Sequence, residues 1–395
     1  MSRDGSSGLR TVRILGTRGI PAAHGGFETF AERLAEYLRQ RGWRVVVYCQ
    51  QDGDGPITED LWNGIERVHV PVPVAGAPGT MLFDWRAIRH ASRSRDLCLT
   101  LGYNTAVFCL ALRLRGIPNV INMDGIEWKR SKWSRPARLW FWANDWIGCK
   151  VADHLIADNP QIRRHLMTRV VEAKIATIPY GADRLQKVGD EALAALGIEA
   201  GRYLTLIARP EPENSVLELV RAFSSRRRGV KLLVLGHYER SNPYHARVLD
   251  AASIEVLFPG AIYDRPTLRA IRFHCLAYLH GHQVGGTNPS LVEAIGASNP
   301  VIANDNPFNR SVMGDAAIYF RDYATAEAAI DRVLDDHALR EHMRAASEAC
   351  FDRAYSWHGV LTQYEQLLER QIGRHRARRR QPVIAAEAPD AVVKR

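Results

Sequence analysis

The chain has 395 residues, of which 46% are hydrophobic, 8% aromatic and 24% charged. This length exceeds a single ordinary core and favours two compact domains, and the composition excludes a fibrous, collagen-like or disordered chain. The formal net charge is +10, with five of the positive charges between Arg374 and Arg380; such a charge attracts nucleic acid, anionic lipid and phosphorylated substrates alike, so it identifies no partner.

The six cysteines are scattered and include no C-x-x-C pair, which favours reduced thiols in a cytoplasm. The first ten residues lack the apolar core of a secretory signal, and no segment reaches the roughly 20 apolar residues of a membrane-spanning helix. We therefore predict a cytoplasmic protein, with any membrane contact peripheral and at the inner face of the cytoplasmic membrane.

The first half of the chain has the pattern of a doubly wound domain. A short apolar strand at 12–16 precedes a glycine-rich loop, a helix with apolar residues at helical spacing from Phe27 to Leu38, and a strand at 44–49. Such a unit places its strands in parallel. Further strands are predicted at 97–101, 119–123, 155–157 and 174–178, with helices at 105–115 and 136–152.

The second half repeats this alternation. Strands are predicted at 203–208, 230–236, 255–258, 275–279 and 300–303, and helices at 216–223, 265–273, 290–297 and 357–370. The prediction is an α/β fold with two Rossmann-like, doubly wound parallel sheets facing across a cleft. The expected parts are a disordered N-terminus (1–10), a first domain (11–183), a second domain (184–356), a helix packing back on the first domain (357–373) and a basic disordered tail (374–395).

The glycine-rich loop at 16–26 leads into a helix N-terminus. Free amides and the helix dipole favour an anion there, and Gly25 and Gly26 let the backbone approach a diphosphate or an acceptor. His24 belongs to the same loop. A tight turn without a ligand is the alternative, and the spacing is not the G-x-G-x-x-G of dinucleotide sites.

The most polar loop lies at 281–290. Thr287 or Asn288 can cap the following helix, and Pro289 suits its first turn. The amides from Gly286 onward can face phosphate or sugar oxygens, while Glu293, one turn into the helix, can accept two hydrogen bonds from a vicinal diol such as ribose. An acidic residue favoured only by the helix dipole is the alternative.

Two further patterns have less specific interpretations. Asp52 and Asp54 have the D-x-D spacing of metal–diphosphate sites, but they lie in a glycine-rich turn, and we assign them no metal. Basic residues alternate with aromatic residues between 128 and 146. That mixture suits a membrane interface presenting a lipid-linked acceptor, and equally a buried helix beside a solvated loop.

Four segments resemble known glycosyltransferases. Residues 293–303 resemble the donor-site signature of family 4 glycosyltransferases, and residues 178–183 resemble their interdomain turn. Residues 14–29 and 122–133 resemble the amino-terminal domain, long of unknown function, of capsule and exopolysaccharide rhamnosyltransferases. The resemblance covers about residues 13–368. It implies the GT-B fold and a retaining, metal-independent transfer of a sugar from a nucleotide diphosphate, without a cofactor.

The resemblance also implies a donor site. It assigns Glu293 to the ribose, Arg209 to the diphosphate, and Ile262 with Tyr263 to the nucleobase. At two positions the chain departs from the family: Gly285 replaces a glutamate, so the backbone of 285–288 is expected to contact the transferred sugar, and Asn214 replaces a lysine, so Arg209 is expected to carry more of the diphosphate charge. The expected donor residues are Gly25, Gly26, Arg209, Asn214, Ile262, Tyr263, Gly285, Gly286, Thr287, Asn288 and Glu293.

The expected catalytic residues are Asp124, His24 and Arg209. The resemblance places the loop of Asp124 beside the transferred sugar, so Asp124 or His24 is expected to position a hydroxyl or to assist proton transfer. A turn-forming Asp-Gly and a solvated loop histidine are the alternatives. On the acceptor side we expect Glu28, Glu127, Lys129 and Arg130.

The predicted function is therefore a metal-independent hexosyltransferase of surface-polysaccharide assembly. The expected donor is dTDP-rhamnose, with a UDP-hexose second, and the expected acceptor is a glycan or a lipid-linked glycan. A sugar-nucleotide epimerase of the same architecture and a non-catalytic basic protein that binds membrane or nucleic acid are the alternatives. Because the sequence has no aromatic strand platform and no recognition-helix pattern, a specific nucleic-acid partner is not expected.

Overall fold

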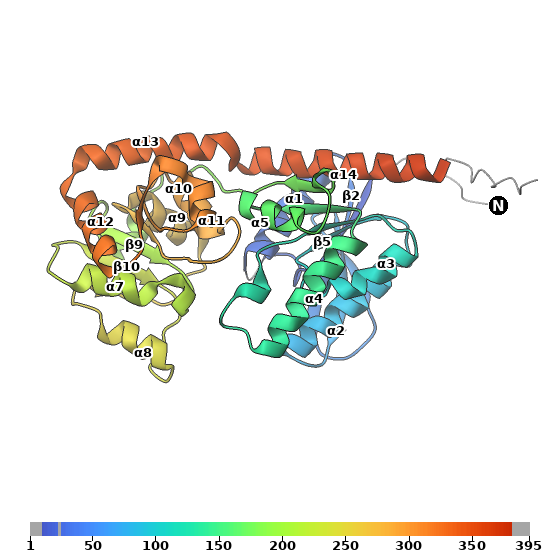
Figure 1. Ribbon diagram of the computed structural model, residues 1–395, viewed down its shortest axis with the longest axis horizontal. Helices are drawn as coiled ribbons and strands as arrows, with labels where there is room; N and C mark the ends of the chain where they lie inside the picture. The colour runs from blue at the N-terminus through green and yellow to red at the C-terminus, as the bar shows by residue number, and fades with distance from the viewer. Residues whose placement is uncertain (1–9, 23–24, 381–395) are drawn as a thin grey trace, which may run out of the picture.

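The computed structural model describes residues 10–22 and 25–380, which form two lobes, each built around a parallel sheet (Figure 1). The first lobe contains β1 (Thr11–Leu15), α1 (Gly25–Gln40), β2 (Arg44–Asp52), β3 (Thr58–Trp62), β4 (Ile65–Val72), α2 (Gly76–Ala91), β5 (Leu97–Leu101), α3 (Leu110–Leu114), β6 (Asn119–Asn122), α4 (Arg135–Val151), β7 (His154–Ala157), α5 (Pro160–Met167) and β8 (Ile175–Thr177).

The second lobe follows in the same manner. It contains α6 (Glu191–Ala194), β9 (Tyr203–Ile207), α7 (Val216–Ser224), β10 (Lys231–Leu235), α8 (Pro243–Asp250), β11 (Val256–Leu257), α9 (Arg265–His274), β12 (Tyr278–His280), α10 (Pro289–Gly296), β13 (Val301–Asn304), α11 (Pro307–Met313), β14 (Ala317–Phe320), α12 (Tyr323–Asp335) and α13 (His337–Ala354). The last helix, α14 (Trp357–Arg380), returns to the first lobe (Figure 1).

Each sheet reverses its strand order beside its first strand. The first sheet has the order β3-β4-β2-β1-β5-β6-β7-β8, in which only β3 is antiparallel to its neighbour, and the second has the order β11-β10-β9-β12-β13-β14. The reversals fall between β1 and β5 and between β9 and β12. Ligands of open parallel sheets bind at such points, at the carboxyl ends of the strands. The loops after these four strands are therefore the places to look for a site.

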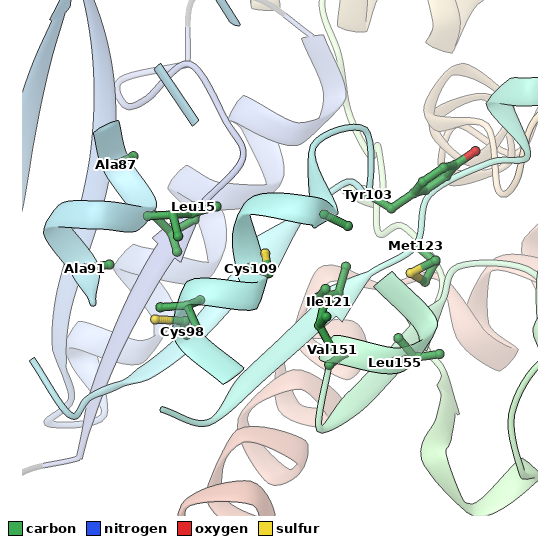
Figure 2. Packing of buried hydrophobic residues seen from close by; sticks show 14 of the residues in the cluster. Leu15, Ala87, Ala91, Cys98, Tyr103, Cys109, Ile121, Met123, Val151 and Leu155 are labelled. Atoms are coloured by element: carbon green, nitrogen blue, oxygen red, sulfur yellow. The ribbon is translucent and has the colours of Figure 1, made fainter. Parts of the chain in front are cut away.

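Apolar side chains hold the helices on both faces of the first sheet. Figure 2 shows part of one face, where Leu15, Cys98 and Ile121 come from three neighbouring strands and Ala87 comes from α2. On the other face, α1 packs together with α14. All six cysteines are buried and free: four lie in the cores of the first lobe, and Cys275 and Cys350 lie in those of the second.

Helix α14 completes the core of the first lobe. Its buried residues Val360, Leu361, Tyr364, Leu367 and Leu368 belong to the cluster that contains Phe30 and Leu34 of α1. Asn122 donates a hydrogen bond to the Tyr364 hydroxyl over 2.8 Å, and the Trp43 indole donates one to Glu365 over 3.1 Å. The expectation of a disordered tail from Arg374 was wrong for residues 374–380, which continue the helix. Arginine is a good helix former, so charge alone did not end the helix there.

The chain crosses between the lobes twice, and the two crossings touch. Ala182 pairs with Ser356 as an isolated parallel bridge, the Ala182 amide donates to the Tyr355 carbonyl over 2.8 Å, and the Trp357 amide donates to the Ala182 carbonyl over 3.2 Å. A Cβ on Gly181 would lie 2.6 Å from the Trp357 ring. The lobes are therefore joined by one compact hinge and not by two separate linkers.

Several elements differ from the sequence prediction. The helix expected at 105–115 is divided into a 3-10 turn at Ala106–Cys109 and the short α3, and the strand expected at 275–279 is β12 at Tyr278–His280. The hairpin of β3 and β4 was not predicted because nearly all of β3 is exposed and has no alternating apolar face. Within the described residues, no helix is long and apolar enough to cross a membrane.

Candidate active site

A cavity of about 680 Å³ lies between the two lobes. It is bounded by the start of α1, the loop after β9, helix α9 and the start of α10. Of the expected donor residues it is lined by Gly25, Gly26, Arg209, Ile262, Tyr263, Asn288 and Glu293. The sequence prediction therefore placed these residues, from both halves of the chain, in a single space. His24 lies outside the described residues.

Two helix N-termini meet in this cavity. A Cβ on Gly26 would lie 3.1 Å from the Pro289 ring, so α1 and α10 approach each other at their first turns. Asn288 caps α10, because its side-chain oxygen accepts a hydrogen bond from the Ser290 amide over 3.0 Å. At the start of α10, Pro289 has no N–H and the amides of Ser290 and Leu291 are bonded to Asn288, so the positive ends of the two helix dipoles are what favours negative charge in this part of the cavity.

Arg209 lies in the cavity on the loop after β9. Its side chain is exposed and makes no ion pair with any residue in the described part of the chain. Asn214 is only 2% exposed and lies under the loop: its side-chain amide donates to the Arg209 carbonyl over 2.8 Å. Asn214 is therefore not among the cavity-lining residues, and its contact shapes the loop that carries Arg209.

Glu293 has a partner that sequence reasoning missed. An Nη of Arg272, on α9, lies 2.5 Å from Oε2 of Glu293, and the Arg272 side chain is only 10% exposed. Arg265, Arg269 and Arg272 all line the cavity. Their spacing of four and then three residues puts them on one helix face, which is a signal that could have been found in the sequence.

The loop expected to contact the transferred sugar instead closes against the first lobe. The Thr287 amide donates to Oδ2 of Asp158 over 2.9 Å, and the Thr287 hydroxyl donates to the Asp158 carbonyl. A Cβ on Gly125 would lie 3.6 Å from the Cα of Gly285. Gly285, Gly286 and Thr287 therefore form the contact between the lobes and are not among the residues that line the cavity.

Two carboxyl groups of the first lobe lie at this contact. Asp124 follows β6 in a left-handed conformation (φ 48°), and its amide donates to the Asn122 side chain over 2.9 Å. Burial and the nearby carboxylate of Glu127 raise the pKa of Asp124 to about 6. Burial and Asp124 raise the pKa of Asp158 well above its usual value, although the Thr287 amide opposes the shift. Asp158 was missed because nothing local to its sequence distinguishes it.

Residues expected on the acceptor side form a charged bridge between the lobes. Arg130 donates to Oε1 of Glu127 over 2.8 Å and, from Nε, to Oε1 of Glu213 in the second lobe over 2.9 Å. Lys132 reaches Glu211 over 3.4 Å. Lys129 is exposed, with its ammonium group 5.3 Å from the ring centroid of Trp128. Glu127 and Arg130 thus hold the loops of the two lobes together.

Comparison with known proteins fits this architecture. Residues 9–183 match the family described as "Domain of unknown function (DUF1972)". No curated protein matches the chain in sequence. Among solved structures, sucrose-phosphate synthase from Thermosynechococcus elongatus is similar over 92% of this chain and 100% of its own, with a TM-score of 0.78 and 18% identity.

Two other solved structures are similar over the same extent. HepE of Anabaena, in complex with UDP and glucose, has a TM-score of 0.73 at 14% identity and covers 92% of this chain and 100% of its own. An α,α-trehalose-phosphate synthase (UDP-forming) from Burkholderia xenovorans, in complex with glucose-6-phosphate, has a TM-score of 0.67 at 13% identity and covers 91% and 100%. The chain has the GT-B fold.

A second cavity, of about 310 Å³, lies within the first lobe. This cavity lies at the strand-order reversal between β1 and β5, and it shares Gly25 and Gly26 with the larger one. Glu28 lines it, and Oε1 of Glu28 accepts a hydrogen bond from the Arg18 amide over 3.2 Å. Asp84 of α2 also lines it and accepts a hydrogen bond from the Thr105 hydroxyl over 2.7 Å.

A buried histidine pair lies behind Arg209 in the second lobe of this GT-B structure. The rings of His280 and His282 stack with their centroids 4.5 Å apart, and His282 lines the larger cavity. Burial and the nearby Arg209 lower the pKa of His282 to about 3. The imidazole of His282 is therefore neutral at ordinary pH, and the larger cavity keeps a neutral hydrogen-bonding ring beside the Arg209 cation.

The basic and aromatic segment at 128–146 is divided between packing and exposure. The Trp128 indole donates to Asp145 over 2.8 Å, and that of Trp133 donates to Glu127 over 3.0 Å. Trp142 and Trp146 on α4 are 44% and 37% exposed, and their rings meet edge to face with centroids 6.4 Å apart. The hydrogen bonds of Trp128 and Trp133 fit the interpretation as a packed segment, and the membrane-interface interpretation of Trp142 and Trp146 stays a prediction.

Proposed function

We propose that the chain is a glycosyltransferase that takes a sugar from a nucleotide diphosphate. One observation carries this proposal: two helix N-termini, the carboxylate of Glu293, and Arg209, which has no ion pair among the described residues, line one cavity between the lobes. Helix amides and a guanidinium group stabilise a diphosphate, and a carboxylate accepts hydrogen bonds from sugar hydroxyls. The fold shared with UDP-bound HepE supports a nucleotide-sugar donor site in this cavity.

In the proposed reaction, a hydroxyl oxygen of the acceptor bonds to the anomeric carbon of the donor sugar. The bond from that carbon to the diphosphate oxygen breaks, and the diphosphate leaves with the electron pair. Its growing charge would be met by Arg209 and the positive dipole ends of α1 and α10. We propose that the acceptor hydroxyl proton passes to water or to Asp124, which lies at the contact between the lobes and does not line either cavity. We propose retention of configuration and no metal, on the sequence resemblance described above.

The finer assignment is also a proposal. dTDP-rhamnose is the first candidate donor because residues 14–29 and 122–133 resemble rhamnosyltransferases of surface polysaccharides, and a UDP-hexose is second. The acceptor would be a glycan or a lipid-linked glycan. Exposed Trp142 and Trp146 beside basic side chains support peripheral contact with the inner face of the cytoplasmic membrane.

The test begins with binding of dTDP, UDP and GDP measured by calorimetry, followed by turnover of dTDP-rhamnose, UDP-glucose, UDP-galactose and GDP-mannose. Arg209→Ala should lower the rate of donor cleavage more than it weakens binding, since its charge matters most as the diphosphate departs. Arg332→Ala, an exposed arginine on α12, is the matched control. Failure to bind any nucleotide diphosphate contradicts the proposal.

Two other outcomes of these assays are informative. Release of an epimerised sugar without any acceptor would indicate the sugar-nucleotide epimerase. Turnover should survive an excess of EDTA, and activity that returns only with manganese or magnesium would contradict metal independence and direct attention to Asp52 and Asp54.

A further inference from the structure

The smaller cavity in the first lobe contains a carboxylate without a cationic partner. Asp84 is 8% exposed, and among the described residues its one side-chain hydrogen bond comes from the neutral Thr105 hydroxyl, to Oδ2, over 2.7 Å. No ion pair joins it to a described arginine or lysine. A buried carboxylate without a cation destabilises a fold, so its presence at a cavity wall calls for a ligand that donates hydrogen bonds.

Most of the other walls of this cavity are neutral. Thr80, Gln50 and Asn104 offer neutral polar groups, and Phe27 and Phe83 offer apolar rings. Of the charged residues in the described lining, Glu28 and Asp84 are acidic and the exposed Arg18 is basic. Such a surface fits a saccharide, which has both hydroxyl groups and apolar C–H faces.

The position of the cavity relates it to the donor. Gly25 and Gly26 line both cavities, so the two cavities share a wall at the start of α1. A ligand in the smaller cavity would therefore lie near a donor bound in the larger one. Reactions between two bound partners require this kind of neighbouring placement.

We propose that the smaller cavity binds the acceptor as a neutral saccharide and that Asp84 excludes sugar phosphates from it. This inference rests on the proposed function. An ionised Asp84 accepts hydrogen bonds from hydroxyl groups through the oxygen that Thr105 leaves free, and it repels a phosphate dianion at close range. Burial raises the pKa of Asp84 to about 6, so the group is largely ionised at neutral pH. Asp84 is thus a specificity-determining residue.

The experiment uses the full chain saturated with the nucleoside diphosphate that it binds best. Saturation-transfer NMR then measures binding of L-rhamnose, D-glucose, D-galactose and glucose 6-phosphate. Wild type should bind at least one neutral sugar and should bind glucose 6-phosphate at least tenfold more weakly. Equal or tighter binding of glucose 6-phosphate, or no binding of any neutral sugar, would overturn the inference.

Variants separate recognition from structural support. Asp84→Asn keeps an oxygen for the Thr105 hydrogen bond but removes the charge. It should therefore weaken the binding of neutral sugars about tenfold, the scale of a charge-assisted hydrogen bond. It should also reduce the difference in affinity between glucose and glucose 6-phosphate, which the loss of a merely structural role would not do. Thr105→Val, which keeps the Asp84 charge, should preserve that discrimination. Asp54→Asn, in an exposed turn, is the control.

The result also separates this inference from the proposed function. If no nucleoside diphosphate binds the wild-type chain, the glycosyltransferase assignment fails. If nucleotides bind with unchanged affinity in Asp84→Asn but the sugar phosphate is preferred in wild type, only the saccharide assignment fails. Should Asp84→Asn not fold, the wild-type comparison of glucose with glucose 6-phosphate still decides the question.

Discussion

Glu293 is held by Arg272 before any ligand arrives, since the two side chains lie 2.5 Å apart. Only part of the carboxylate is then available to ribose hydroxyls, so Glu293 serves both the fold and the expected nucleotide. This double role changes what a substitution of Glu293 should do. A loss of affinity and a loss of stability should appear together, because Glu293→Gln leaves the buried guanidinium group without its anion.

Glu293→Gln should weaken binding of the nucleoside diphosphate by about 1 to 3 kcal/mol, the scale of a charge-assisted hydrogen bond. It should also lower the thermal midpoint. Calorimetry and thermal denaturation measure the two effects. Arg272→Met should lower stability while retaining most of the affinity, because Glu293 keeps its charge. Unchanged nucleotide affinity in Glu293→Gln would remove this residue from the donor site.

Asp124 should give the transfer rate a dependence on pH. Its pKa is raised to about 6 by burial and by Glu127, so the carboxyl group takes up its proton at a higher pH than an ordinary aspartate. If the ionised form assists transfer, kcat should fall as the pH decreases through about 6 and should be constant above 7. Rates between pH 5 and 8 measure this.

The matched comparison is Asp124→Asn with Asp54→Asn. Asp124→Asn should have a low kcat at every pH, and its kcat should no longer fall as the pH decreases through about 6. Asp54→Asn should keep the pH dependence of the wild type. A pH dependence that survives in Asp124→Asn would assign the titration to another group, with Asp158 the first candidate because its pKa is also raised.

Asn214 shows how the structure alters an expectation at this scale. A lysine stands there in the resembling family, so the resemblance alone predicts that Asn214→Lys is tolerated or even helps transfer. The side chain is 2% exposed and bonds to the Arg209 carbonyl. A lysine would bury a cation beneath the loop and would lose that hydrogen bond, so Asn214→Lys should destabilise the second lobe.

Among the elements, the loop from β12 to α10 has the contact that closes the cavity. A Cβ on Gly286 would lie 2.1 Å from Oδ1 of Asp158, so any larger residue must displace this contact. Gly286→Ala should therefore reduce turnover at least tenfold while each lobe remains folded. Kinetics and small-angle scattering test this, since a displaced contact should separate the lobes.

A suitable control is Gly260→Ala. Gly260 has a left-handed backbone (φ 89°), which Gly286 does not, and a Cβ there would meet nothing within 4 Å. An added methyl group without a clash should cost little activity. Equal losses in both variants would mean that the loss of glycine flexibility, and not the contact with Asp158, explains the effect.

The elements also show why part of the site was predictable. Buried parallel strands were located by their apolar runs, and the polar loops at their carboxyl ends contain Gly25, Gly26, Arg209 and Asn288, which do share one cavity. The sequence analysis predicted neither Asp84 nor the helix α2 that contains it. α2 begins at Gly76 after Ala75, which provides no side-chain cap, and its buried face includes Gly79 and Asp84. It therefore has neither a start signal nor a continuous apolar stripe.

An Asn-Pro pair marks the start of four helices, of which only α10 was predicted from it. Asn288-Pro289 was interpreted as a cap and first turn, and the same Asn-Pro pair begins α5, α8 and α11, each with the asparagine side chain accepting a backbone hydrogen bond. Those three helices could have been predicted. Asp158 could not be assigned in this way, because its partner Thr287 is distant in sequence. The spacing of Arg272 places it on a helix face, but its pairing with Glu293 on another helix could not be predicted.

At the scale of the whole molecule, the first lobe depends on the last helix. Val360, Leu361, Tyr364, Leu367 and Leu368 are all at most 5% exposed. Burying one large apolar side chain contributes about 1.5 to 3 kcal/mol. Their combined contribution is of the same order as the roughly 5 to 15 kcal/mol that stabilises a whole domain.

A chain ending at Ser356 should therefore fail to form a stable first lobe. Denaturant unfolding monitored by tryptophan fluorescence should show loss of the cooperative transition of that lobe, while the second lobe unfolds as in the full chain. The peptide 357–380, added separately, should restore part of the signal. An unchanged transition for the first lobe would contradict the role given to α14.

The return of α14 also determines the order in which this protein can mature on the ribosome. Residues 11–177 are synthesised first and contain every strand of the first sheet, but the face formed by Phe30 and Leu34 is covered only after residue 368 has been made. The second lobe must emerge in the meantime. The nascent chain therefore exposes an apolar surface throughout most of translation, and any premature stop before Trp357 yields a product that cannot bury it.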